Sequence, residues 1–296
     1  MAVWAYSYVL IKIAYNYNVT PALLVLMRLV LASITLILFT KITKKLQPIN
    51  KQDRLLFLLL AFFEPFLYYI GESNGLVYVS PTVGSIIIAT IPVFIPFVLY
   101  LWFKEKIDKT NFFGIIISFI GVLLVILEDD YSLSASPKGL AFMFLAVFSA
   151  CGYTIAIKNL TEKYNAFTIV TYQTLIGGVL YIPLFLSSDI KAIENIVFSW
   201  QMISATITLA IFATAIAYIL FSIGIREIGA MRSTIFANFI PVLTALLALF
   251  SGMEELPLRK LGGIAIVISG VFLAQNKKPF LGLPGMLWNY FYKKSK

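Results

Sequence analysis

The chain contains a long series of apolar segments separated by short polar connections. A search for stretches of about 20 apolar residues, the length that a ~30 Å hydrocarbon layer requires, predicts ten of them. The expected segments are Ala2–Tyr15, Pro21–Thr40, Leu55–Ile70, Pro81–Phe103, Phe112–Leu127, Leu140–Ile157, Phe167–Leu186, Trp200–Ile223, Ala230–Ser251 and Leu261–Ala274. Charged residues make up only 12% of the 296 positions, whereas a water-soluble domain needs roughly 25% to cover its surface. The sequence therefore predicts an all-α integral membrane protein with ten transmembrane helices.

Several classes of chemistry are disfavoured by composition. The chain has no histidine, and Cys151 is its only cysteine, so we expect no disulfide, no metal site and no His-activated nucleophile. No Walker-type Gly-Lys-Ser/Thr motif is present, which disfavours an ATP-driven pump. We therefore expect no cofactor and no catalytic residues.

Basic residues are distributed unevenly among the connections. The odd-numbered connections carry only Lys138, Lys191, Arg259 and Lys260. The even-numbered connections and the C-terminus carry Lys41, Lys44, Lys45, Lys51, Arg54, Lys104, Lys106, Lys109, Lys158, Lys163, Arg226, Arg232, Lys277, Lys278, Lys293, Lys294 and Lys296. The positive-inside rule then predicts a multi-pass protein of the plasma or inner membrane with both termini in the cytoplasm. This distribution explains the net charge of +9 better than nucleic-acid binding does, because the clusters form no continuous face.

Two features at the ends of the chain follow from the same pattern. The first segment is not expected to be a signal peptide, because it lacks a basic start and Lys12 interrupts its apolar run. Whether further residues precede Met1 is left open. The segment 276–296 is expected to be a basic cytoplasmic tail, either lying at the membrane interface or disordered.

The two halves of the chain resemble each other at a fixed offset of 149 residues. The offset aligns Gly75 with Gly224, Pro92 with Pro241, Glu105 with Glu254, Gly114 with Gly263 and Gly121 with Gly270. Earlier in each half, Tyr17-Asn18 aligns with Tyr164-Asn165 at an offset of 147. We therefore predict two repeats, at 1–130 and 137–275, of five helices each.

Five is an odd number, so the two repeats must cross the membrane in opposite directions. Inverted repeats are typical of secondary transporters, because exchanging the conformations of the halves opens a central site to each side in turn. The glycine pairs Gly114 with Gly121 and Gly263 with Gly270 lie seven residues apart, hence on one helix face. They predict close helix packing rather than ligand binding.

Several motifs resemble the drug/metabolite transporter superfamily, specifically its EamA-type ten-helix members. They are Pro21-Ala-Leu-Leu-Val-Leu-Met-Arg28, Ser80-Pro81 leading to Ile91-Pro92, Lys104-Glu105-Lys106-Ile107, and Gly114 with Gly121. The resemblance implies two EamA repeats around a central cavity and transport of amino acids, other metabolites, nucleobases or drugs, often outward. The chain departs from the pattern at Trp4-Ala5, where Trp-Gly is usual, and at Leu175, where the Arg28 pattern would recur. Substrate identity does not follow from so varied a family.

Three charged residues fall inside predicted spans, namely Lys12, Arg28 and Glu64. A charge in hydrocarbon costs ~2.5–3.5 kcal/mol, so each must face a cavity or a partner. At 1.5 Å per residue, Arg28 and Glu64 lie at similar depths and can meet. One interpretation is a structural ion pair. The other is a site where Glu64 binds a proton or a cationic group, and Arg28 or Lys12 neutralises it or holds a substrate anion.

Other polar and aromatic residues are expected around these charges. The predicted substrate-binding residues are Trp4, Tyr8, Lys12, Arg28, Tyr68, Tyr69, Gln173, Tyr218 and Asn238, and Tyr153 and Tyr172 lie among them. Gln173 and Asn238 can face either the cavity or another helix, because a buried amide needs a partner. Pro65, Pro92 and Pro241 each remove a backbone hydrogen bond, which either kinks the span or frees carbonyls to line a cavity.

Together these features predict a secondary active transporter of small metabolites such as amino acids or drugs, with Glu64 coupling export to protons. An uncoupled facilitator or channel remains open. A membrane-embedded enzyme is disfavoured, because Glu64 is taken as the only acid deep in a span. The expected partners are a small-molecule substrate and the lipid bilayer, without nucleic acid, and the oligomeric state is open.

Overall fold

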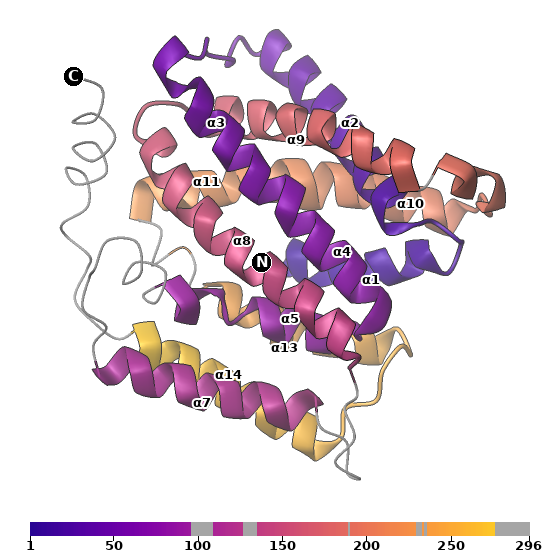
Figure 1. Ribbon diagram of the computed structural model, residues 1–296, viewed down its shortest axis with the longest axis vertical. Coiled ribbons are helices and arrows are strands. Elements are labelled where there is room, and N and C mark those ends of the chain that lie inside the picture. The colour runs from indigo at the N-terminus through magenta and orange to yellow at the C-terminus, as the bar shows by residue number, and fades with distance from the viewer. Residues whose placement is uncertain (96–108, 127–134, 189, 229–232, 234–235, 276–296) are drawn as a thin grey trace.

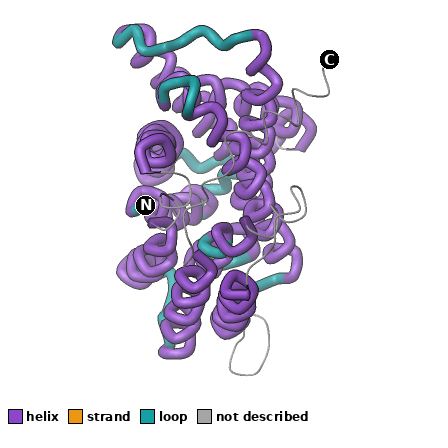
Figure 2. The backbone as a smooth tube through the Cα atoms, turned by 90° about the vertical axis from the view of Figure 1, so that its left-hand side faces the viewer, coloured by secondary structure: helices purple, strands orange, loops and turns teal. Residues whose placement is uncertain are grey.

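The computed structural model describes residues 1–95, 109–126, 135–188, 190–228, 233 and 236–275. Within these residues every regular element is a helix and no strand occurs (Figures 1 and 2). The expected end of the fourth segment at Phe103, the motif from Lys104 to Ile107 and the tail 276–296 lie outside the described residues.

The first part of the chain forms helices that begin close to where the apolar segments were predicted. They are α1 (Ala2–Tyr15), α2 (Pro21–Ile42), η1 (Lys51–Asp53), α3 (Arg54–Ala61), η2 (Phe62–Leu67), α4 (Tyr68–Tyr78), α5 (Pro81–Ile88) and α7 (Lys109–Ile126). Residues 91–95 are also helical. Three helices, α3, η2 and α4, follow one another without a connection and form a single long segment.

The second part of the chain is built in a similar way. Its helices are α8 (Pro137–Thr161), α9 (Ala166–Ser188), η3 (Ile190–Asn195), α10 (Trp200–Thr208), η4 (Leu209–Ile216), α11 (Ala217–Ile228), η5 (Phe236–Asn238), α13 (Phe239–Phe250) and α14 (Leu258–Gln275). Here α10, η4 and α11 form the continuous long segment.

Local sequence signals explain several helix starts. Proline occupies the first position of α2, α5 and α8, where its missing N–H has no helical partner to lose. The side chains of Ser80, Ser136 and Ser199 accept backbone N–H groups at the starts of α5, α8 and α10. The predicted starts at Pro21, Pro81 and Trp200 are therefore confirmed.

The surface of the described helices is rich in apolar side chains. Among the described residues, five segments are long and apolar enough to cross a membrane, namely Pro21–Ile42, Lys51–Tyr78, Pro137–Thr161, Ala166–Ser187 and Trp200–Glu227. Shorter apolar helices cover Ala2–Tyr15, Pro81–Ile95, Phe112–Ile126 and Phe236–Phe250. Large apolar side chains such as Ile42, Leu38 and Phe250 remain exposed on the outside. A surface of this kind requires lipid.

The third predicted span is longer than expected. We expected it to end at Ile70, but α4 continues to Tyr78 and buries Gly71, Glu72 and Ser73. Gly71 allows the close approach to α8, because a Cβ there would lie 2.5 Å from the carbonyl oxygen of Phe142. Polar residues therefore continue the helix where the hydropathy pattern indicated a connection.

Proline positions also differ from the expected kinks. Pro92 and Pro241 lie in the first turns of the helical stretch 91–95 and of α13, where a missing N–H breaks no helical hydrogen bond. Pro65 lies in the middle of a long helical segment, in η2, and Pro183 lies inside α9.

The helices pack in pairs across the molecule. Helices α7 and α14 lie side by side at one end, and α2 packs against α9 at the other (Figure 1). The predicted role of the glycines in close packing is confirmed. A Cβ at Gly121 would lie 2.6 Å from the backbone nitrogen of Val267, and Gly270 approaches Gly114 and Ser118 equally closely. Helix α1 lies between these ends, in contact with α4, α5, α10 and α13.

Candidate functional site

A cavity of about 90 Å³ lies where α1, the η2–α4 segment, α8 and α11 meet. It is lined by Trp4, Ser7, Tyr8, Arg28, Glu64, Tyr68, Tyr69, Glu72, Ile88, Ala89, Ile91, Pro92, Ala150, Tyr153, Thr154, Tyr218, Phe221, Ala237 and Ile240. Most of this wall is aromatic or aliphatic, and the charged side chains are few. Concave, mainly apolar sites with a small number of polar groups are typical of ligand-binding sites.

The backbone is broken where Glu64 enters the cavity. Glu64 has extended dihedral angles, φ −145° and ψ 117°, in the middle of the long α3–η2–α4 segment. Pro65 follows and supplies no N–H. The carbonyl oxygen of Phe63 at the break accepts hydrogen bonds from the backbone of Tyr68 and from the Ser149 hydroxyl on α8. The carbonyl group freed at the break is therefore hydrogen-bonded, in part by a neighbouring helix.

The carboxyl group of Glu64 is buried and meets a single hydrogen-bonding side chain. Its exposed fraction is 7%, and the Tyr218 hydroxyl on α11 donates a hydrogen bond to its Oε1 atom. Among the described residues, no Lys or Arg nitrogen lies within 4 Å of this carboxyl group. Glu64 thus faces the cavity without a positive partner.

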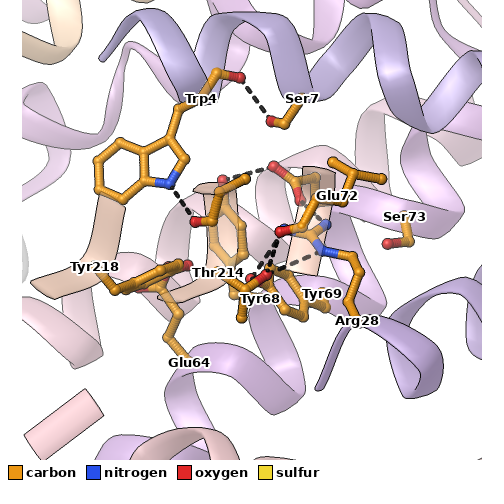
Figure 3. A network of polar contacts seen from close by, with 12 residues as sticks. Trp4, Ser7, Arg28, Glu64, Tyr68, Tyr69, Glu72, Ser73, Thr214 and Tyr218 are labelled. Atoms are coloured by element: carbon orange, nitrogen blue, oxygen red, sulfur yellow. Dashed lines mark hydrogen bonds and ion pairs between the residues drawn. The ribbon is translucent and has the colours of Figure 1, made fainter. Parts of the chain in front are cut away.

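Arg28 is held by a network on a different side of the cavity (Figure 3). Its Nη2 atom donates to the Tyr69 hydroxyl at 3.1 Å, and its Nε atom donates to Thr214 Oγ1 at 3.2 Å. The Tyr69 ring lies 4.4 Å from the guanidinium carbon. The Nη1 atom lies 3.9 Å from Glu72 Oε2 and makes no hydrogen bond.

Glu72 is the acidic partner of Arg28, and it was missed in the sequence. Its exposed fraction is 4%, and its Oε1 atom accepts a hydrogen bond of 2.9 Å from Tyr68. The expectation that Glu64 is the only acid deep in a span is wrong, because α4 extends beyond Ile70. Of the two interpretations of Arg28 and Glu64, the direct ion pair does not occur, because the acidic neighbour of Arg28 is Glu72. The sequence did contain a signal for Glu72. It is a second carboxylate two helical turns after Glu64, and the residues between them include no charged residue.

Aromatic side chains form one wall of the cavity beside Glu64. The Trp4 ring lies 5.3 Å from the Tyr218 ring and 5.2 Å from the Phe221 ring, both edge-on. The Trp4 indole donates to the carbonyl oxygen of Ala213 in η4 at 3.0 Å, which fixes its orientation. Tyr153 packs at 6.4 Å from Tyr218, and its buried hydroxyl group makes no hydrogen bond.

Most of the predicted site residues come together in this cavity. Those that line it are Trp4, Tyr8, Arg28, Glu64, Tyr68, Tyr69 and Tyr218, joined by Tyr153. Lys12, Gln173, Asn238 and Tyr172 do not line it. Besides Glu72, the cavity includes Ser7 and Thr154, whose types are too common in apolar helices for the sequence to single them out.

The predicted polar residues outside the cavity have different surroundings. Lys12 is half-buried in the last turn of α1. Gln173 on α9 and Asn238 in η5 are buried, and neither the Gln173 Oε1 atom nor the Asn238 amide atoms make a hydrogen bond. These amides therefore do not join helices through hydrogen bonds of the described residues.

A metal site requires several acidic or other ligating side chains close together. Within the part of the chain that the structure describes, no group of three or more His, Cys, Asp or Glu side chains is placed to hold a metal ion. The arrangement instead offers one unpaired carboxyl group, one ion pair and several aromatic faces.

Comparison with known proteins adds to this geometry. The model of the EamA-like transporter family matches residues 1–127 and 137–275. An Archaeoglobus fulgidus protein named an uncharacterized transporter is 29% identical over 219 residues, covering 74% of this chain and 76% of its own. The uncharacterized transporter YdfC of Bacillus subtilis is 31% identical over 267 residues, covering 87% and 84%.

A solved crystal structure has the same fold, with a TM-score of 0.66 at 15% sequence identity and coverage of 92% of this chain and 93% of the other. The family match extends over nearly all of the described helices, including every helix that lines the cavity. This chain is a multi-pass membrane protein and belongs to the EamA-like transporter family.

Proposed function

We propose that the chain is a secondary active transporter that exports small metabolites, such as amino acids or drugs, in exchange for protons. The observation that carries this proposal is Glu64, whose buried carboxyl group lines the cavity and has no Lys or Arg nitrogen of the described residues within 4 Å. An ionised carboxylate in such a place is strongly unfavourable unless a proton or another cation neutralises it. A group that must hold either a proton or a substrate can exchange one for the other.

The proposal includes ten spans arranged as two inverted repeats, 1–130 and 137–275. The supporting observation is that equivalent elements recur at the offset of 149 residues. Adding 149 to the residue numbers of α7, 109–126, gives 258–275, and these residues are helical in α14. The same shift carries η2, the broken part of the first long segment, onto 211–216, which lies inside η4.

The contacts between α7 and α14 support a two-fold relation between the repeats. Gly121 contacts Gly263, and Gly114 contacts Gly270. At the offset of 149, Gly263 is the equivalent of Gly114, and Gly270 is the equivalent of Gly121. Exchanging the two repeats therefore converts one contact into the other. Such reciprocity is what a two-fold axis requires. A two-fold axis in the membrane plane is the arrangement from which alternating access follows.

We place both termini in the cytoplasm and the protein in the plasma or inner membrane, on the distribution of Lys and Arg among the connections. In this arrangement Glu64 serves as the proton-coupling residue. Trp4, Tyr8, Tyr68, Tyr69 and Tyr218 contact the substrate, and Arg28 with Glu72 sets the charge of the cavity. No catalytic step is needed for this role.

Gradient-driven transport in proteoliposomes tests the proposal. The transported probe is the compound that most raises the melting temperature of the purified protein among amino acids, amines, nucleobases and cationic dyes. The wild type is expected to accumulate this probe above equilibrium when a pH gradient is imposed. Glu64→Gln is expected to lose accumulation, because an amide cannot carry a proton, and Glu64→Asp is expected to retain part of it.

The matched control is Glu194→Gln, which makes the same change at an exposed residue in η3 and is expected to leave accumulation unchanged. Undiminished accumulation by Glu64→Gln would reject Glu64 as the carrier. A wild type that only equilibrates the probe would identify a passive facilitator instead.

A further inference from the structure

We infer that the cavity binds an organic monocation, an amine or quaternary ammonium compound with an apolar body and no free carboxylate. The inference rests on the proposed function, since it names the substrate class of the same site. Three independent features support it: the charge balance of the cavity, the engagement of Arg28, and the aromatic wall beside Glu64.

The charge balance leaves one negative charge to be neutralised. Among the described residues, the charged side chains that line the cavity are Arg28, Glu64 and Glu72, which gives +1 − 2 = −1 when all three are ionised. The pair of Arg28 and Glu72 balances within itself, at 3.9 Å. The remaining charge belongs to Glu64. A monocation neutralises this charge, whereas a zwitterion leaves the net charge of the site at −1 and an anion makes the net charge more negative.

Arg28 is poorly placed to receive a substrate carboxylate. Its Nε and Nη2 atoms already donate to Thr214 and Tyr69. The Nη1 atom has no hydrogen bond, but its acidic neighbour is Glu72. A substrate carboxylate at Nη1 would lie beside the Glu72 carboxylate, and like charges at this distance repel strongly in a buried site. For an amino acid, the unfavourable interaction of its carboxylate with Glu72 would therefore offset the favourable interaction of its ammonium group with Glu64.

The aromatic wall suits a cation that is not fully hydrated. The Tyr218 hydroxyl group donates a hydrogen bond to Glu64, so a cation bound at this carboxyl group would also lie near the Tyr218 ring. Trp4 and Tyr153 adjoin that ring, at 5.3 and 6.4 Å between centroids. Aromatic faces attract ammonium groups, including quaternary ones that cannot donate a hydrogen bond.

The rest of the wall sets the body of the ligand. Ile88, Ile91, Ala150 and Ile240 line the cavity and offer no polar side chain. An apolar ring or chain attached to the ammonium group would be buried against them, which adds hydrophobic free energy. A small hydrophilic cation lacks this contribution.

Binding to the purified protein in detergent tests the inference without any transport step. Calorimetry would compare four probes that share a phenyl ring: 2-phenylethylamine, benzyltrimethylammonium, L-phenylalanine and 3-phenylpropionate. We expect the two cations to bind roughly tenfold or more tightly than phenylalanine, and phenylpropionate to give no measurable binding. Equal or tighter binding of phenylalanine, or failure of both cations to bind, would overturn the inference.

Variants identify the groups responsible. Glu64→Gln is expected to lose cation binding, and Trp4→Leu is expected to weaken benzyltrimethylammonium more than it weakens phenylalanine. Glu72→Gln frees Arg28 and makes the site neutral, so phenylalanine should then bind more tightly than 2-phenylethylamine. Glu194→Gln, at an exposed residue, is expected to bind all four probes as the wild type does. Cation binding that survives Glu64→Gln contradicts the inference.

Failure of the inference and failure of the proposed function give different results. If the protein binds phenylalanine better than 2-phenylethylamine and still accumulates its substrate under a pH gradient, the inferred substrate class is rejected and the proposed function stands. If the protein binds the cations but never accumulates them, the inferred substrate class stands and coupled transport is rejected.

Discussion

At the scale of single residues, the unequal surroundings of two carboxyl groups define the cavity. Glu64 and Glu72 lie eight residues apart on the long α3–η2–α4 segment, Glu64 at its break and Glu72 in α4, and both are buried. Glu72 is paired with Arg28 and accepts a hydrogen bond from Tyr68. Among the described residues, Glu64 has only the neutral Tyr218 hydroxyl group as hydrogen-bond partner. These unlike surroundings are the basis for the different roles that we propose, structural for Glu72 and exchangeable for Glu64.

The pairing of Arg28 with Glu72 predicts an asymmetric response to mutation. Arg28→Gln leaves two buried carboxyl groups without a cation, whereas Glu72→Gln leaves Arg28 in a cavity that still contains Glu64. We expect Arg28→Gln to lower the free energy of unfolding by about 3 kcal/mol, and Glu72→Gln to lower it by less.

Unfolding in mixed micelles with increasing dodecyl sulfate measures both effects. The double variant is expected to lose less than the sum of the single losses, because the two side chains interact directly. Equal losses for the two single variants would show that Glu64 does not compensate Arg28.

At the scale of elements, a close approach of two backbones joins α7 to α14. A Cβ at Gly121 would lie 2.6 Å from the Val267 nitrogen and 2.9 Å from the Gly263 carbonyl oxygen. Backbone atoms cannot rotate away as a side chain can. Nearby Gly262 has nothing within 4 Å of a Cβ position and is exposed.

These surroundings predict opposite outcomes for two alanine substitutions. Gly121→Ala is expected to destabilise the protein by about 1–3 kcal/mol, because the helices must separate. Gly262→Ala is expected to be neutral or slightly stabilising, since alanine favours a helix more than glycine does. Thermal unfolding of both variants in the same detergent makes the comparison. Equal melting temperatures would contradict the close packing.

The sequence predicted elements better than it predicted their partners. Apolar length and initial prolines were sufficient to locate α1 and the starts of α2 and α5. The spacing of Gly114 and Gly121 was sufficient to predict a close helix contact. The end of the third span was wrong because Glu72 is stabilised by Arg28, a residue of another helix. Hydropathy measures each segment alone and cannot register a charge that is neutralised across the fold.

The cavity shows the same limit. Trp4, Tyr8, Arg28, Glu64 and Tyr218 were expected in one site because polar and aromatic groups inside spans need a common cavity. Gln173 and Asn238 satisfied the same criterion, yet the structure places them outside it. The face of the helix on which such a residue lies decides between these outcomes, and uniformly apolar helices give no periodic signal for that face.

At the scale of the whole molecule, the proposed orientation makes a prediction about the two sides of the membrane. Asn16 follows α1 and Lys44 follows α2, and both are exposed. The positive-inside distribution puts Asn16 outside the cell and Lys44 in the cytoplasm.

Single cysteines can report this difference. In a Cys151→Ala background, Asn16→Cys is expected to react with a membrane-impermeant maleimide added to intact cells, and Lys44→Cys only after permeabilisation. Cys151 is buried, so its replacement removes background without exposing a new surface. The reverse labelling pattern would invert the proposed topology, and labelling of both sites from outside would contradict the count of spans.

The length of α8 affects how it can cross the membrane. Its 25 residues extend about 38 Å, against ~30 Å for the hydrocarbon layer. A helix longer than the layer is accommodated when it tilts or when its ends extend into the headgroup region. A change in the local thickness of the lipid would therefore act on the slope of this helix, and through its contacts with α3, α4 and α5 on the neighbouring helices.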